Sequence, residues 1–272
     1  MKYYNKYVIT SDGLRIRYVR MGTKNSPSII FIHGLGERLE TWKYQISYFS
    51  SFYNVVALDL RGFGLSETPS TLSSVYDYVE DVRAVISEEN IERVIICGLS
   101  LGGLVAIASY DSFPDIVSGL VLADSTAYYP RSIVEKILPE RLKLIESQGL
   151  SKLSEIIASS ALINASKEDV ELVKASIRSV NVEYYKRALE VTLKADLRHV
   201  LPKINVPTLI LVGEYDKTTP LNLAKDLKAN IKTSDLKVVK NASHISKLDN
   251  PEEFNSYLKE CLERITQEST KF

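Results

Sequence analysis

The sequence predicts an α/β protein of three layers, with a mostly parallel sheet that carries helices on both faces. Short, continuously apolar runs alternate with segments of helical periodicity along most of the chain. Continuous hydrophobicity is typical of strands that are buried on both faces, as in parallel sheets. Right-handed crossovers then place each intervening helix on a face of the sheet. At 272 residues, with 45% hydrophobic and 25% charged residues, one globular domain with an insertion is expected.

The chain opens with two strands that predict an antiparallel hairpin. Residues 7–10 and 14–20 are rich in β-formers, and Ser11-Asp12-Gly13 between them has the composition of a tight turn. Four short apolar runs follow it and are expected to be fully buried strands, at Ser28–Ile32, Tyr53–Leu58, Arg93–Cys97 and Val117–Ala123. Two more strands are expected at residues 206–213 and Leu236–Val239. The prediction is therefore a sheet of eight strands.

Helices are expected between and after these strands. From Val75 to Ile86 the apolar residues recur at helical spacing, which gives one stripe that can lie on the sheet. Further helices are predicted after Ser100, at Leu221–Ile231 and at Pro251–Ile265, with Pro251 suited to a first helical turn.

Between residues 126 and 199 the strand-like runs stop and helical patterns such as Leu142 and Ile145 take over. We therefore expect residues 1–125 to form the first part of the core, 126–199 a helical insertion, and 200–272 the second part of the core.

Charge and composition make several classes of partner unexpected. Lys plus Arg equals Asp plus Glu at 34 each, so no net field favours nucleic acid or a membrane surface. No apolar run approaches the roughly 20 residues that cross a bilayer, and residues 1–6 lack the apolar segment of a secretory signal, so a cytoplasmic location is expected. Cys97 and Cys261 show no metal-ligand spacing and are predicted to be inert, buried thiols.

One glycine-rich motif predicts a nucleophilic serine. Gly98-Leu99-Ser100-Leu101-Gly102 follows a buried strand and precedes a helical pattern, which is the context of a G-x-S-x-G nucleophile elbow. Such a turn needs glycines on both sides, and it exposes the Ser100 hydroxyl at the end of the strand. It also places the Leu101 amide at a helix start, where it can face an oxyanion. The alternative is an ordinary strand-to-helix turn with Ser100 as a helix cap.

A serine needs a base, and the chain offers three histidines. His244 is the predicted base, because it lies beyond the last strand and follows Ser100 and an acid in the chain order that this kind of site requires. His33, directly after the first buried strand, is expected to orient its loop. His199, at the end of the helical insertion, is expected to be structural.

The base in turn needs an acid that holds its tautomer. Asp216, in the segment after residues 206–213, is the favoured candidate. Asp124, after the Val117–Ala123 strand, and Glu214 remain open alternatives. Leu35, in His33-Gly34-Leu35-Gly36, is the candidate for a second oxyanion amide, because this loop follows the strand from which that amide comes in such sites.

Together with Asp59–Ser66, a D-x-R-G-x-G-x-S turn, these motifs resemble the α/β-hydrolase superfamily. The elbow and the segment Leu122–Ala127 are similar to the carboxylesterase and 3-oxoadipate enol-lactonase branch. The resemblance implies a three-layer α/β-hydrolase fold, a helical cap over the site and a structural role for Asp59. Because haloalkane dehalogenases and epoxide hydrolases of this fold have an aspartate in place of Ser100, it also implies acyl chemistry, with no metal or organic cofactor.

The expected function is hydrolysis of a small carboxylic ester or lactone through an acyl-serine, by a monomer or homodimer without nucleic-acid or membrane partners. Two alternatives remain. One is hydrolytic carbon–carbon cleavage of a diketone, for which basic residues of the insertion would bind a dianionic substrate; the candidates are Arg131, Lys136, Arg187 and Lys194. The other is a non-catalytic ligand receptor that retains the hydrolase fold.

Overall fold

All eight strands belong to one sheet in the computed structural model, which describes residues 3–24 and 26–269. The strands are β1 (Lys6–Ile9), β2 (Arg15–Met21), β3 (Ser28–Ile32), β4 (Asn54–Leu58), β5 (Val94–Leu99), β6 (Val117–Ala123), β7 (Thr208–Gly213) and β8 (Ser234–Val239). Their order across the sheet is β1-β2-β4-β3-β5-β6-β7-β8. Only β2 runs antiparallel to its neighbours β1 and β4, and the other pairs are parallel. The predicted hairpin and the predicted fold class are confirmed.

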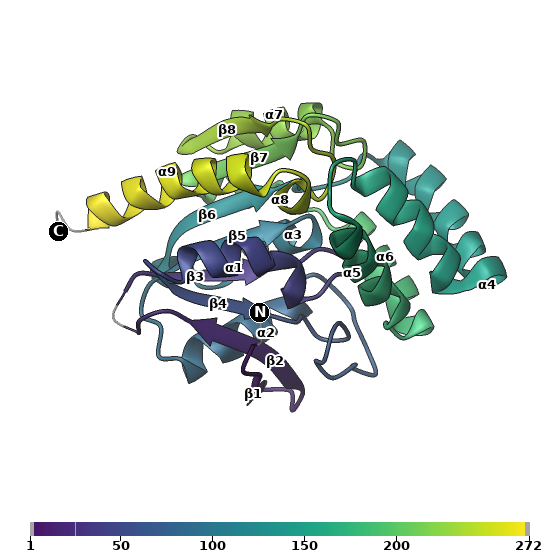
Figure 1. Cartoon of the computed structure of the whole chain (residues 1–272), viewed down its shortest axis with the longest axis horizontal. Coiled ribbons are helices and arrows are strands. Elements are labelled where there is room, and N and C mark those ends of the chain that lie inside the picture. The colour runs from purple at the N-terminus through teal and green to yellow at the C-terminus, as the bar shows by residue number, and fades with distance from the viewer. Residues whose placement is uncertain (1–2, 25, 270–272) are drawn as a thin grey trace.

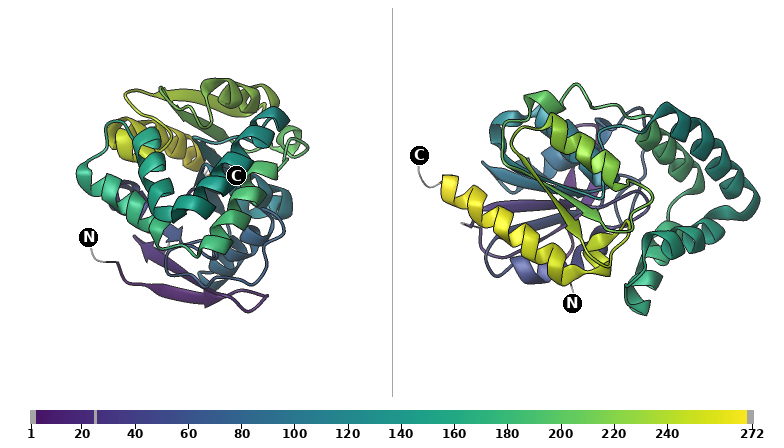
Figure 2. Two further views of the ribbon diagram at one scale, coloured as in Figure 1. Left: turned by 90° about the vertical axis from the view of Figure 1, so that its right-hand side faces the viewer. Right: turned by 90° about the horizontal axis from the view of Figure 1, so that it is seen from above.

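Helices cover both faces of the sheet (Figure 1, Figure 2). Their bounds are α1 (Lys43–Phe49), α2 (Asp77–Glu88), α3 (Leu101–Ser112), α7 (Leu221–Asn230), α8 (Ser246–Asp249) and α9 (Pro251–Ser269), with short 3₁₀ turns η1 (Leu39–Trp42), η2 (Pro114–Ile116) and η3 (Leu201–Lys203). Helices α1 and α9 lie on one face, and α2, α3 and α7 on the other. The central strands β4 and β5 are buried along their whole length, which explains their continuous hydrophobicity.

Helix α1 is absent from the sequence-based prediction. It has only seven residues, and several of them are aromatic or β-branched. Its Ile46 and Phe49 side chains are buried in the hydrophobic core. So short a helix shows less than two full periods of an amphipathic pattern, and its stability comes from this packing rather than from local propensity.

Three helices follow β6 and lie beyond the carboxyl ends of the central strands (Figure 1). They are α4 (Arg131–Ala161), α5 (Lys167–Arg178) and α6 (Val182–Lys194). The Ser166 and Asn181 side chains cap α5 and α6 by accepting hydrogen bonds from backbone amides of their first turns. Helix α4 bends at Gly149, whose φ of 70° and ψ of −179° are not helical.

In the part of the chain that the structure describes, no helix combines the length and the hydropathy needed to cross a bilayer. Cys97 and Cys261 are free and buried, and burial raises the pKa of both thiols.

Candidate active site

Ser100 lies in a strained turn between β5 and α3. Its φ of 55° and ψ of −114° are unusual for a residue with a side chain. A Cβ atom on Gly98 would lie 2.0 Å from the Gly102 carbonyl oxygen, and one on Gly102 would lie 2.2 Å from the Ile32 oxygen. The Ser125 hydroxyl donates a 2.8 Å hydrogen bond to the Ser100 carbonyl. The turn therefore needs both glycines, as the elbow motif predicts.

His244 lies between Ser100 and Asp216. Its Nδ1 is 2.9 Å from Asp216 Oδ2, and its Nε2 is 3.0 Å from Ser100 Oγ. Because a carboxylate only accepts hydrogen bonds, Nδ1 carries the proton and Nε2 accepts from the Ser100 hydroxyl. This is the hydrogen-bond order of a Ser-His-Asp arrangement, and the three residues come from the loops after β5, β7 and β8.

Of the three acids that the sequence leaves open, only Asp216 hydrogen-bonds His244. Its other oxygen accepts from the Thr218 and Thr219 amides at 2.8 and 3.0 Å. Asp124 instead accepts hydrogen bonds from the Gly213 amide and from the amide and hydroxyl of Ser246. Glu214 accepts from the Asn241 amide and pairs with Lys240 at the surface.

The pair of His244 and Asp216 is electrostatically matched. Burial lowers the pKa of His244, but the Asp216 carboxylate, together with the charges of Asp124 and Glu37, raises this pKa above its ordinary value. Burial likewise raises the pKa of Asp216, yet His244 and the Thr219 hydrogen bonds hold it below its usual range. A proton taken up by His244 is therefore stabilised by a carboxylate that stays ionised.

The loop after β3 contains His33 and Leu35. His33 Nε2 accepts from the Leu60 amide at 3.0 Å, so Nδ1 donates to the Gly34 carbonyl at 2.8 Å. Burial lowers the pKa of His33, which favours this neutral form. His33 thus ties the loop to the segment after β4 and makes no contact of this kind with Ser100.

Asp59 and His199, for which the sequence predicts structural roles, do not contact Ser100. Asp59 accepts hydrogen bonds from Arg17 and from the Leu39 and Leu65 amides, which is a structural arrangement. His199 is largely exposed, 3.9 Å from Asp111.

Leu35 and Leu101 carry the amides that the sequence singles out for an oxyanion. Neither amide donates a hydrogen bond to another group within residues 3–24 and 26–269. Leu101 is the first residue of α3 and therefore has no intrahelical partner. Leu35 lines the same pocket as Ser100.

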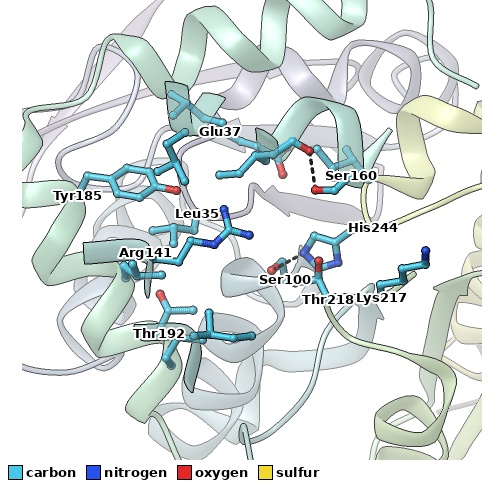
Figure 3. A pocket seen from close by; sticks show the side chains of 18 of the residues that line it. Leu35, Glu37, Ser100, Arg141, Ser160, Tyr185, Thr192, Lys217, Thr218 and His244 are labelled. Carbon is cyan, nitrogen blue, oxygen red and sulfur yellow. Dashed lines mark hydrogen bonds between the residues drawn. The ribbon is translucent and has the colours of Figure 1, made fainter. Parts of the chain in front are cut away.

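A pocket of about 290 Å³ opens at Ser100 and His244, between the strand ends and helices α4 to α6 (Figure 3). Its walls from these helices are mostly apolar and include Ile137, Leu153, Ile157, Val173, Ile177 and Leu189. A small apolar pocket with a few polar groups at one point is typical of a site for a small molecule.

The structure also brings residues to the pocket that the sequence analysis missed. Arg141 and Glu37 line it. Glu37 pairs with the buried Lys247 at 2.6 Å. Arg141 is on the buried side of α4, four residues after Ile137 and four before Ile145. A charged residue in this apolar row is the sequence signal that could have identified it.

The four basic residues that were predicted for the insertion are placed elsewhere. None of Arg131, Lys136, Arg187 and Lys194 lines the pocket at Ser100, so this part of the prediction is wrong. Arg187 and Lys194 border a separate hollow beside residues 72–76. Periodicity alone does not distinguish the buried face of α4 from its exposed face.

Within the described ranges, no group of three or more His, Cys, Asp or Glu residues is placed to hold a metal ion.

Comparison with known proteins decides the family. The model of the family described as "Serine aminopeptidase, S33" matches residues 23–249. The chain belongs to this family of α/β hydrolases. The match contains all of the motifs at Ser100, Asp216 and His244.

Relatives within the superfamily differ in what their names say they act on. The chain is 29% identical over 264 residues to 3-oxoadipate enol-lactonase 2 of Acinetobacter baylyi, covering 96% of this chain and 97% of that protein. It is 26% identical over 287 residues to epoxide hydrolase 3 of Xenopus tropicalis, covering 94% and 77%. The crystal structure of the enol-lactonase from Burkholderia xenovorans LB400 matches with a TM-score of 0.86 at 23% identity, covering 94% and 99%. This likeness confirms the fold.

Proposed function

We propose that the chain hydrolyses a small carboxylic ester or lactone, with Ser100 as nucleophile, His244 as base and Asp216 as the acid that orients His244. The single observation that carries this proposal is the hydrogen-bond chain from Ser100 Oγ through the His244 ring to Asp216 Oδ2. A family relative named as an enol-lactonase supports the choice of an acyl substrate. Ser100 itself supports it too, since a serine nucleophile forms an acyl ester where an aspartate forms an alkyl ester.

In the proposed reaction, His244 Nε2 takes the Ser100 proton as Oγ attacks the carbonyl carbon. The negative charge on the tetrahedral oxygen is met by the free amides of Leu35 and Leu101. When the intermediate collapses, His244 gives its proton to the leaving alkoxide, and an alcohol and an acyl-Ser100 ester result. Water, deprotonated by His244, then attacks this ester and releases the carboxylic acid and free Ser100. In this proposal α4 to α6 act as a cap that shapes the pocket.

A reactive-serine assay tests the proposal. A fluorophosphonate is expected to add its mass to Ser100, and 4-nitrophenyl butyrate is expected to be hydrolysed. The Ser100→Ala variant should lose the label and at least about 10³-fold in kcat, as expected when one member of such a triad is removed. Circular dichroism of the variant checks that it folds. A folded wild-type protein that is not labelled, and that hydrolyses none of a panel of short esters and lactones, would refute the proposal and favour a ligand receptor.

A further inference from the structure

We infer that Lys247 is a positioning residue for the proposed reaction. Through its ion pair with Glu37, it fixes the position of the Leu35 amide relative to the base. The inference rests on the proposed function, in which the Leu35 amide meets the oxyanion and His244 is the base. Lys247 is not among the residues that line the pocket at Ser100, so its effect on the reaction passes through Glu37.

The Leu35 amide belongs to a tight turn of residues 34–37, here called the oxyanion turn. The Glu37 amide closes this turn by donating a 3.1 Å hydrogen bond to the Gly34 carbonyl. Gly36, the third residue of the turn, has a φ of 78°, which is the conformation that glycine adopts in type II turns. Leu35 is the second residue, whose amide takes no part in the hydrogen bond that closes the turn. The placement of Glu37 therefore affects where the Leu35 amide points.

The Glu37 side chain folds back over the oxyanion turn. A Cβ atom on Gly34 would lie 2.6 Å from Glu37 Oε1 and 3.1 Å from Leu99 Cδ2. The carboxylate thus lies against Gly34, beside the strand residue that precedes Ser100. Glu37 and Leu35 both line the pocket (Figure 3). A group that holds the Glu37 carboxylate consequently holds the turn that carries the Leu35 amide.

Lys247 holds this carboxylate. Its Nζ is 2.6 Å from Glu37 Oε2 and 3.0 Å from Thr41 Oγ1. It also lies 4.1 Å from the centre of the Trp42 ring, whose face attracts a cation. The side chains of Lys247 and Glu37 are 0% and 5% exposed, so water screens their attraction little. Burial raises the pKa of Glu37, but Lys247 and Thr41 hold this pKa below its usual range, which keeps the carboxylate ionised.

Helix α8 connects Lys247 to His244, which is three residues earlier in the chain. The helix is anchored on both sides of Lys247. The amide and hydroxyl of Ser246 donate to Asp124 at 3.0 and 2.6 Å. Asp249 Oδ2 accepts a 2.8 Å hydrogen bond from the amide of the residue before His244. The backbone that carries His244 is therefore held together with α8, and Lys247 extends from this unit to the oxyanion turn.

An ion pair is not needed to fill this space. Two hydrophobic side chains of similar volume often stabilise a protein as much as a buried ion pair, because buried charges lose their hydration. The ion pair adds direction, since the carboxylate must lie where the ammonium can donate to it. An oxyanion amide is effective only within hydrogen-bond distance of the developing charge. Stability and positioning can therefore be separated by experiment.

Two variants test the inference. Lys247→Met removes the charge and keeps an apolar stem, and the Glu37→Leu/Lys247→Met double variant replaces the pair by two apolar side chains. Lys247→Met is expected to lower kcat for 4-nitrophenyl butyrate by about 10- to 100-fold and to change KM by less than about threefold, because the oxyanion contact strengthens in the transition state. It should also lower the urea midpoint, since Glu37 is left buried without its partner. The double variant should regain a urea midpoint close to that of the wild type, and its kcat should stay at least about tenfold below.

A reversible inhibitor reports on the oxyanion site itself. Ser100 Oγ adds to the carbonyl carbon of 1,1,1-trifluorohexan-2-one, the Ser100 proton passes to His244, and the carbonyl oxygen becomes an oxyanion. In Lys247→Met the inhibition constant should rise by about the same factor as kcat/KM falls, because both depend on the same amides. A loss of stability without misplacement of the amide would leave this constant unchanged.

Arg20→Met is the matched control. It removes the Arg20–Glu89 ion pair of 3.2 Å, and neither residue lines the pocket at Ser100. It should lower the urea midpoint and leave kcat and the inhibition constant unchanged. Wild-type kcat in Lys247→Met, or in the stable double variant, would overturn the inference. If Lys247→Met does not fold, the double variant still decides, because it leaves neither charge of the pair buried alone.

Hydrogen exchange separates this inference from the proposed function, because it requires no turnover. In Lys247→Met, a peptide containing residues 33–42 is expected to exchange at least about tenfold faster than in the wild type, and peptides from β7 should exchange at the same rate. This result in a protein that hydrolyses no ester would support the hold of Lys247 on the oxyanion turn and refute the hydrolase proposal. Equal ester hydrolysis and equal exchange in wild type and variant would refute the positioning role and leave the hydrolase proposal intact.

Discussion

His244 faces the Asp216 carboxylate with Nδ1 and the Ser100 hydroxyl with Nε2. It acts as a base only when it is neutral. Because Asp216 raises the pKa of His244 above its ordinary value, which is about 6.5, we expect kcat/KM for a neutral ester to rise with pH and to reach half of its plateau above pH 6.5.

Asp216→Asn removes the charge that raises this pKa and leaves the burial that lowers it. The acidic limb of the profile should therefore move to lower pH, and the plateau should fall on the order of 10⁴-fold, since the asparagine also favours the wrong His244 tautomer. The pH dependence of kcat/KM measures both effects. Glu214→Gln, at the surface acid two residues away, should leave the profile unchanged; an unmoved limb in Asp216→Asn contradicts the assignment.

At the scale of elements, helix α4 has two limbs that meet at Gly149. The first limb carries Arg141 and the second carries Leu153 and Ile157, and both limbs line the pocket. Gly149 has φ 70° and ψ −179°, a conformation that is essentially restricted to glycine. The bend therefore aims the two limbs at the same space, which a straight helix of this length would not do.

Gly149→Ala should destabilise the protein by about 1–3 kcal/mol, through backbone strain alone. A Cβ at this position would meet no atom within 4 Å, so no steric clash contributes. Urea-induced unfolding measures the change. Ser151→Ala, at an exposed position two residues further on, should stay within about 0.5 kcal/mol of wild type. Equal stability of the two variants would show that the bend has another cause.

At the scale of the whole molecule, the sheet and the α4–α6 helices are unequally buried. Strands β4 and β5 are buried at every position, whereas α4 exposes many of its residues and α5 and α6 expose a few. Segments with fewer buried apolar contacts open at a lower free-energy cost than core strands. The pocket lies between these two parts.

Hydrogen exchange followed by mass spectrometry should reveal this difference. Peptides from residues 131–194 are expected to exchange faster than peptides from β3, β5 and β6, because they open without global unfolding. The amides of β3 and β5 serve as the internal reference, since they form the middle of the sheet. Protection of residues 131–194 equal to that of β5 would indicate one cooperative unit instead.

Features that depend on near neighbours in the chain are predictable from one sequence. The eight strands follow from apolar runs, and the strained turn at Ser100 follows from the positions of Gly98 and Gly102. Chain order also predicted that His244 would lie beyond the last strand, where the structure brings it to Ser100. These signals are local, so a single sequence contains them.

Which distant groups meet depends on how the chain packs in three dimensions. Asp124, Glu214 and Asp216 all follow strands, and their hydrogen-bond partners distinguish them. Residue type and spacing favour four exposed or distant basic residues over Arg141, because the buried face of α4 depends on what packs against it. Contacts between residues far apart in the chain depend on how the strand-end loops and the α4–α6 helices pack in three dimensions, and residue type and spacing do not encode that packing locally.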